Sequence, residues 1–318
     1  MNALVDSVNF ADIEDAAERN KNRIRRTPCL RARFVSTPLR NGPTMLKLEC
    51  LQVTGSFKVR GANNAIQQLD DDTRRRGVVT ASGGNHGIAV AYAAYVSKCT
   101  ATIYLPDNAP PDKAERSRAW GAEVVVAGTG WDEAHAAALE HAELDGLSYI
   151  HPFADRAVIA GQGTIALEML KQSPEIDVIV AGIGGGGLIS GIALAAKAIK
   201  PEIRVIGVEP VGAPTLKSSL TAGALVTLND VNTGANTLAP RRSEAINLEI
   251  IREYVDDIVL VCDEQMRRAT QWLWFEMGQA VELAGGSAVA AIQAGKVQAP
   301  DDKTVAAVVC GNGTAGLN

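Results

Sequence analysis

The sequence predicts an α/β fold in which mainly parallel strands alternate with helices along the chain. Short apolar runs bounded by turn residues recur, and longer alanine-rich segments with helical spacing lie between several of them. In addition, the run at 177–181 shows no polar alternation, which is typical of a strand buried on both faces. We therefore expect twisted sheets that are flanked by helices.

The predicted elements follow the same alternation in chain order. Strands are expected at 77–81, 100–105, 123–127, 177–181, 205–208, 258–261 and 305–310. Helices are expected at 87–97, 111–120, 131–144, 161–172 and 188–199. The segment 212–234 has weak periodicity and is expected to form a helical excursion over the sheet.

Composition and charge exclude several classes of protein. The 318 residues carry a net charge of −5 and only 4% aromatic side chains, which argues against a nucleic-acid-binding surface. No run of about eighteen apolar residues occurs, so no membrane span is expected. The five cysteines form no CxxC pair and the four histidines have no metal-ligand spacing, so we expect neither disulfides nor a metal site. The charged first 25 residues lack the apolar core of a signal peptide, which indicates a cytoplasmic protein.

Lys58 is the candidate catalytic residue. It follows Gly55, Ser56 and Phe57, and apolar residues at helical spacing come after it. Because Ser56 is a good N-cap, Lys58 is expected in the first turn of a helix. The positive end of the helix dipole disfavours a second positive charge, so part of the amine stays neutral and can attack an aldehyde. Taken alone, the pattern also fits an exposed structural lysine, and further motifs decide between the two interpretations.

Four consecutive glycines form the second motif. Gly184, Gly185, Gly186 and Gly187 follow a predicted strand and precede a predicted helix. Glycines allow successive backbone N–H groups to point at one centre, with the helix dipole behind them. This loop therefore predicts an anion site that is suited to a phosphate.

The same segment also matches a dinucleotide-binding fingerprint. Gly182, Gly184 and Gly187 fit GxGxxG, and Glu209 ends the next predicted strand, about where a ribose-binding acid would lie. A nicotinamide-dependent dehydrogenase is therefore an alternative interpretation.

A second strand-to-helix loop carries the third motif. Ser82, Gly83, Gly84, Asn85 and His86 follow the strand predicted at 77–81. Small residues followed by asparagine form an anion-binding turn, here suited to the carboxylate of a substrate. An ordinary loop with an asparagine cap is the alternative.

Cys310 ends the last predicted strand and would face the cleft at the carboxyl edge of the sheet. The alternative is a buried structural cysteine.

Together these motifs resemble those of the fold-type II pyridoxal-phosphate (PLP) enzymes, and most closely the threonine/serine dehydratase and serine racemase group. The resemblance extends over nearly the whole chain, from 54–58 to the terminal Cys-Gly-Asn-Gly. It implies two domains, each a mainly parallel twisted sheet flanked by helices, as in tryptophan synthase β. The large PLP-binding domain would comprise 1–45 and 150–318, and the small domain 46–149.

The resemblance also implies roles for individual residues. Lys58 corresponds to the lysine that forms a Schiff base with PLP, and Phe57 would pack near the ring. Asn85 would hydrogen-bond the ring hydroxyl, Gly184 to Gly187 would hold the phosphate, and Cys310 would face the pyridine nitrogen. A neutral thiol there leaves the nitrogen largely unprotonated, which suits β-elimination better than transamination.

Several positions depart from the family pattern. Gly83 replaces the serine that donates a proton on the second face in the racemases. In the family's divalent-metal site, Glu209 is retained but Thr215 replaces the second acid. Near the expected substrate position, 235–237 reads Ala-Asn-Thr instead of Ala-Asp-Gly, and 282–283 reads Glu-Leu instead of Glu-Pro.

The resemblance thus implies a PLP-dependent dehydratase (ammonia-lyase, EC 4.3.1 type) that acts on a small β-hydroxy amino acid such as L-threonine or L-serine. The nicotinamide dehydrogenase, and a sensor that binds PLP and an amino acid without turnover, remain as alternatives. A homodimer or homotetramer is expected, and Trp272, Trp274 and Phe275 are predicted to form core or a subunit interface.

Overall fold

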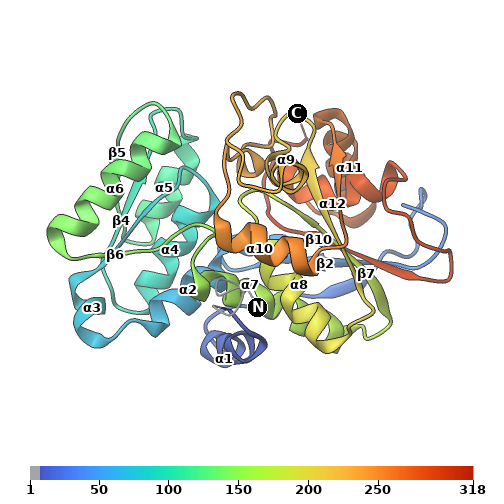
Figure 1. Cartoon of the computed structure of the whole chain (residues 1–318), viewed down its shortest axis with the longest axis horizontal. Helices are drawn as coiled ribbons and strands as arrows, with labels where there is room; N and C mark the ends of the chain where they lie inside the picture. Colours follow the sequence, from blue (N-terminus) through green and yellow to red (C-terminus); the bar gives the residue numbers. More distant parts are fainter. Residues whose placement is uncertain (1–7, 318) are drawn as a thin grey trace.

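A computed structural model of the chain describes residues 8–317, and within them the strands form two separate sheets (Figure 1). The large sheet has the spatial order β1 (Cys29–Arg31), β2 (Thr44–Leu48), β10 (Thr304–Val309), β7 (Ile176–Gly182), β8 (Arg204–Pro210) and β9 (Asp257–Val261). The small sheet has the order β5 (Glu123–Val126), β4 (Ala101–Leu105), β3 (Val78–Ala81) and β6 (Ser148–Tyr149). Every neighbouring pair is parallel except β1 and β2. The predicted α/β class with mainly parallel sheets is confirmed.

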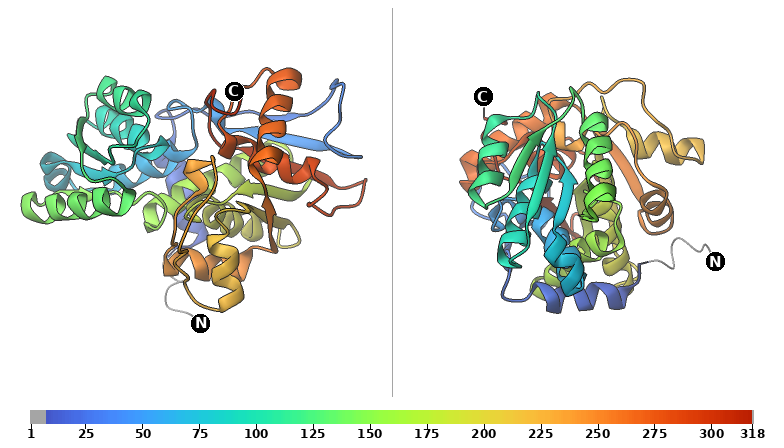
Figure 2. Two further views of the ribbon diagram at one scale, coloured as in Figure 1. Left: turned by 90° about the horizontal axis from the view of Figure 1, so that it is seen from above. Right: turned by 90° about the vertical axis from the view of Figure 1, so that its left-hand side faces the viewer.

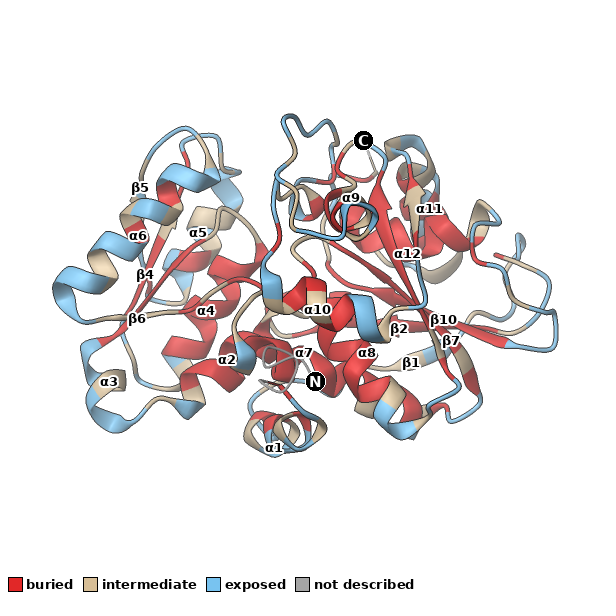
Figure 3. Cartoon of the chain, in the orientation of Figure 1, coloured by how far each residue is buried: buried red, intermediate tan, exposed pale blue. Residues whose placement is uncertain are grey.

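Helices flank both sheets. They are α1 (Phe10–Asn20), α2 (Lys58–Gln68), α3 (Asp71–Arg76), α4 (Asn85–Val96), α5 (Pro111–Ala119), α6 (Trp131–Asp145), α7 (Arg156–Gln172), α8 (Gly187–Ile199), α9 (Thr215–Ala222), α10 (Ala245–Tyr254), α11 (Asp263–Met277) and α12 (Leu283–Gln293), with short 3-10 turns η2 (Glu49–Leu51) and η3 (Asn236–Leu238). Three helices, α4, α8 and α12, are buried along most of their length, as Figure 3 shows. Their alanine- and glycine-rich sequences allow this close packing against the sheets.

The predicted strands and helices are present in the structure, but several observed elements were not predicted, among them helices α1, α10, α11 and α12. Strands β1, β2 and β6 were not predicted: β6 has only two residues, and β2 contains Lys47, a charged residue at a fully buried position. Helix α7 begins five residues earlier than expected, because the carboxylate of Asp155 accepts hydrogen bonds from the first backbone N–H groups. In the segment 212–234, only Thr215–Ala222 is helical.

The two sheets lie side by side, with the small sheet and α3 to α6 forming one part of the molecule (Figure 2). The loops that follow β3, β7 and β10 leave the carboxyl ends of parallel strands, where ligands bind in α/β proteins. The loop after β3 contacts the other part of the molecule: a Cβ on Gly84 would lie 3.6 Å from the Thr237 side chain, and Asn85 hydrogen-bonds Glu282. The other two loops reach the same place, because a Cβ on Gly184 would lie 2.7 Å from Thr237 O and a Cβ on Gly311 would lie 3.2 Å from Asn85 Nδ2. The candidate site lies where these loops meet.

Candidate active site

Lys58 is the first residue of α2, as predicted, but its helix begins differently from the prediction. The N-cap is Phe57, with no side-chain hydrogen bond, and the prediction that Ser56 caps the helix is wrong. Ser56 instead forms a β-bridge with Gly311, and its buried hydroxyl has no partner. The backbone of this segment is fixed by the chain end, because Phe57 N donates to Cys310 O over 3.1 Å.

The amine of Lys58 lies in an environment that favours its neutral form. Its Nζ donates to Pro152 O over 2.7 Å. Desolvation lowers the pKa of Lys58 to about 8, against smaller opposing effects of Cys310 and Glu282. A pKa of about 8 leaves about a tenth of the amine neutral at pH 7, far more than for an ordinary lysine. Lys58 can therefore act as a nucleophile and a base.

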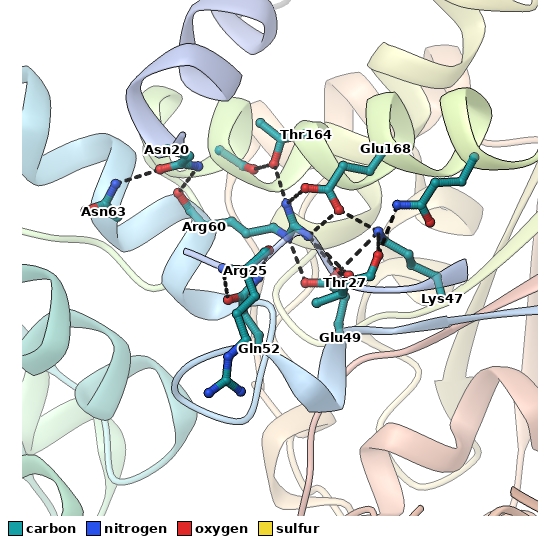
Figure 4. A network of polar contacts seen from close by, with 12 residues as sticks. Asn20, Arg25, Thr27, Lys47, Glu49, Gln52, Arg60, Asn63, Thr164 and Glu168 are labelled. Atoms are coloured by element: carbon teal, nitrogen blue, oxygen red, sulfur yellow. Dashed lines mark hydrogen bonds and ion pairs between the residues drawn. The ribbon is translucent and has the colours of Figure 1, made fainter. Parts of the chain in front are cut away.

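Four charged residues, which we call the ion cluster, fix the helix that carries Lys58 (Figure 4): they are the buried Lys47, Glu49 and Arg60 and the partly buried Glu168. Arg60 donates to Glu49 from Nε over 2.7 Å and to Glu168 from Nη1 over 2.8 Å. Lys47 Nζ donates to the other oxygen of Glu168. Residues 60 and 58 point to opposite faces of α2, because each residue of a helix turns by about 100°. The ion cluster thus contacts the face of α2 that lies opposite Lys58.

The loop after β3 presents Ser82 to His86 as predicted, with Asn85 and His86 at the start of α4. The Ser82 hydroxyl accepts from Gly84 N over 3.2 Å, which shapes the turn. Asn85 Nδ2 donates to Glu282 Oε1 over 2.7 Å. Burial lowers the pKa of His86 to about 3, so its ring is neutral; one nitrogen contacts Ile150 O and the other, Nδ1, is buried without a partner.

The four-glycine loop lies between β7 and α8, also as predicted. Gly185 O accepts from Ser243 Oγ over 2.8 Å and from Asn247 Nδ2 over 3.0 Å. In a trans peptide the following N–H points away from the carbonyl, so the N–H of Gly186 faces away from these donors. Gly186 has a φ of 98°, in the region that favours glycine, and a Cβ on Gly185 would lie 2.3 Å from the ring of Phe153. The loop therefore requires glycine and presents N–H groups at a helix N-terminus.

Cys310 directly follows β10 and is buried. Its Sγ donates to Ala284 O over 3.4 Å. Burial raises the pKa of the Cys310 thiol well above its usual range, with a further contribution from Glu282. The thiol is therefore neutral at physiological pH and can be only a weak partner for a ring nitrogen.

These residues fit PLP. The glycine loop offers N–H groups to a phosphate, and Lys58 offers a partly neutral amine to an aldehyde. In the segments that carry Lys58 and Asn85, the hydroxyls of Thr54 and Ser56 and Nδ1 of His86 are buried polar atoms with no hydrogen-bond partner. Polar atoms of this kind are normally satisfied by water or a ligand. Lys58, Asn85, Gly184–Gly187 and Cys310 would hold the cofactor.

The structure does not support the dinucleotide interpretation. Both carboxylate oxygens of Glu209 accept from the backbone at the start of α9, from Leu216 N over 2.8 Å and from Lys217 N over 2.9 Å. A ribose would have to displace these hydrogen bonds. Gly182 lies within β7, and a Cβ there would be 2.5 Å from Ser287 Oγ, so packing inside the protein explains this glycine.

Several contacts within the site could not be predicted from the sequence, although Glu282 itself lies at a position of the family pattern. Lys113 and Glu282 contact Asn85, although they are 28 and 197 residues away along the chain. Asn247 and Ser243, which hold the glycine loop, come from a loop and helix that no motif marks. Their roles depend on contacts between distant segments, which local pattern does not report.

Comparisons with known proteins agree with this site. The family model described as "Pyridoxal-phosphate dependent enzyme" matches residues 21–311. An L-threonine ammonia-lyase of Thermotoga maritima is 40% identical over 285 residues, which cover 90% of this chain and 71% of that protein. The catabolic L-threonine dehydratase TdcB of Staphylococcus aureus is 36% identical over 306 residues, covering 96% and 88%.

Solved structures give the same result. Maize serine racemase has a TM-score of 0.92 at 35% identity and covers 96% of this chain and 94% of its own. The processed threonine deaminase isoform 2 of Solanum lycopersicum has a TM-score of 0.89 at 33% identity, covering 98% and 91%. The chain belongs to the PLP-dependent enzyme family, in the threonine/serine dehydratase and serine racemase group, and is a PLP-dependent lyase.

Proposed function

We propose that this protein is a dehydratase that removes water from a small β-hydroxy amino acid such as L-threonine or L-serine. The released aminoacrylate product is then hydrolysed by a water molecule to a 2-keto acid and ammonia. The observation that carries the proposal is the amine of Lys58, which donates to Pro152 O and whose pKa burial lowers to about 8. The names of the relatives support this substrate class, because three of them act on threonine and one is a serine racemase.

Different residues of the chain have different roles in the proposed reaction. Bound PLP supplies an electron sink at the α-carbon of the substrate. Backbone N–H groups at 82–86, where α4 begins, bind the substrate carboxylate. Lys58 Nζ, when neutral, takes the α-proton, and the buried, neutral Cys310 avoids protonating the ring nitrogen.

Replacement of the lysine tests the proposal. Lys58→Ala should lower 2-keto acid formation from L-threonine and L-serine by several orders of magnitude, because one residue serves as nucleophile and base. Lys171→Ala, which alters an exposed lysine of α7, serves as the control and should retain full activity. Near-normal turnover by Lys58→Ala would refute the role of Lys58. A wild type that releases ammonia from neither amino acid would refute the substrate class and leave the sensor hypothesis.

We also propose the domain division inferred from the resemblance. The large domain comprises 1–45 and 150–318 and the small domain 46–149, although residues 1–7 and 318 lie outside the described residues. The separate large and small sheets support this division. Because β2, Thr44–Leu48, lies in the large sheet, the first boundary is better placed after residue 48.

A homodimer or homotetramer is further proposed. Trp272 is buried and its Nε1 donates to Thr37 O, whereas Trp274 and Phe275 at the end of α11 are exposed. Phe34, on a loop pinned to the same helix through Ser36 and Glu276, is fully exposed as well. Sedimentation velocity of wild type and Phe275→Ser tests this assignment, since a dimer that uses this surface should dissociate in the variant.

For localisation, we propose the cytoplasm, on the basis of five free cysteines. Among the described residues, no helix is sufficiently long and apolar to span a membrane. Fractionation of cells that express the protein tests this proposal.

A further inference from the structure

The side-chain amide of Asn85 is held at both ends by charged groups. Its Nδ2 donates to Glu282 Oε1 over 2.7 Å, and its Oδ1 accepts from Lys113 Nζ over 3.0 Å. An ammonium group can only donate, so the contact with Lys113 identifies Oδ1 as the acceptor and leaves Nδ2 to donate to Glu282. Burial raises the pKa of Glu282, and the charge of Lys113 opposes this shift. One N–H of Nδ2 then remains for a further acceptor.

The partners of Asn85 come from both parts of the molecule. Asn85 begins α4 and Lys113 lies in α5, both beside the small sheet. Glu282 is the N-cap of α12, which packs on the large sheet. Thr237 Oγ1 donates to the same oxygen of Glu282 over 3.3 Å and fixes the carboxylate from its own side. Elements from both parts of the molecule therefore fix the orientation of the amide.

We propose that Lys113 and Glu282 are positioning residues that act through Asn85, and that together they direct its remaining N–H toward the ring hydroxyl of PLP. We call these three residues the amide clamp. Charge-assisted hydrogen bonds are stronger than neutral ones, so the clamp can hold the amide before the cofactor arrives. The proposal rests on the assignment of this cleft to PLP, but not on the identity of the substrate.

Two variants of similar size to the native residues test the clamp. Glu282→Gln and Lys113→Met each remove one charge, and each should weaken PLP binding to the apoprotein by about three- to tenfold. Each should also change the ratio of the near-ultraviolet and visible absorbance bands of the bound cofactor, which reports the proton of the ring hydroxyl. Arg118→Met alters an exposed cation of the same helix and should leave both properties unchanged. Lys113→Arg, which keeps a cationic donor, should restore most of the wild-type spectrum.

The Asn85→Ala background separates positioning from a direct effect. In that background, Glu282→Gln and Lys113→Met should cause no further change in PLP affinity or in the spectrum. A further loss of threefold or more there would overturn the proposal, and so would wild-type spectra in both single variants. Thermal unfolding of each apoprotein verifies that it is folded. Because no substrate is added, failure of the clamp is distinguishable from failure of the proposed substrate class.

Discussion

The ion cluster and the amide clamp each fix one element of the site with charged side chains, but they differ in composition and in what they join. The ion cluster contains two cations and two anions that contact one another directly. The clamp contains one charge of each sign, linked only through a neutral amide. The cluster ties α2 to β2, η2 and α7, whereas the clamp links α4 and α5 to α12.

This difference indicates that the helix of Lys58 is held more firmly than the side chain of Asn85. Lys47, Glu49 and Arg60 are fully buried, so neither water nor salt can replace a lost partner. Lys113 is only partly buried, and water can solvate its ammonium group if the amide moves away. The helix of Lys58 is therefore firmly attached beside the large sheet, while the link to Asn85 can be broken at a smaller cost.

The largest effect is expected from Arg60→Met, which leaves two carboxylates in the ion cluster without their main partner. Removal of one partner from a buried ionic network costs about 3–5 kcal/mol. Urea unfolding of the apoprotein should show this loss, whereas Lys113→Met should cost less than about 1 kcal/mol. Equal losses of unfolding free energy in the two variants would contradict the conclusion that the ion cluster is held more firmly than the amide clamp.

Glu209 sharpens the comparison, because it is a buried carboxyl with backbone donors but no hydrogen-bonded cation. Burial raises the pKa of Glu209 to about 7, so the folded protein binds this proton more tightly than the unfolded chain does. The associated stability is present below about pH 4.3 and is lost as the pH rises through 7, by about 3 kcal/mol in total. Unfolding free energies of wild type, measured relative to Glu209→Gln, should fall by this amount between pH 4.5 and 8. A flat difference would show that the carboxyl ionises normally.

The same contrast explains how much could be predicted from the sequence. The four-glycine loop and the position of Lys58 follow from local properties, since glycine permits the φ of 98° at Gly186 and a helical pattern follows Lys58. The prediction that Ser56 caps that helix was wrong, because Ser56 forms a β-bridge with Gly311, which lies about 250 residues away along the chain. Glu282 and Lys113 were not assigned for the same reason, and the roles of the site residues toward PLP stay predictions.

A smaller effect is expected at Glu168, which has cationic partners that Glu209 lacks. Burial opposes ionisation, but the hydrogen bonds and charge of Arg60, with Lys47, hold the pKa of Glu168 below its usual range. Its contribution is therefore present above about pH 4.3 and is lost as the pH falls further. Glu168→Gln should be less stable than wild type by about 1–3 kcal/mol at pH 7, and the difference should shrink in acid. A difference that grows as the pH falls would contradict the assigned role of the ion cluster.

The smallest effect concerns Gly83, two residues before the amide of the clamp. Inversion of an amino acid requires a proton donor on each face of its α-carbon, and Gly83 has no side chain with which to supply the second proton. Wild type should therefore leave residual L-serine almost free of D-serine after partial turnover, as measured by chiral chromatography.

The backbone at Gly83 does not have a positive φ, but an added Cβ would lie 2.8 Å from Cβ of Ala109. Gly83→Ser combined with Ala109→Gly should relieve this contact and add slow racemisation, whereas Gly83→Ala with Ala109→Gly, which lacks the hydroxyl, should not. Abundant D-serine from wild type would mean that another group supplies the second proton, and the unpaired Nδ1 of His86 would be the first to replace.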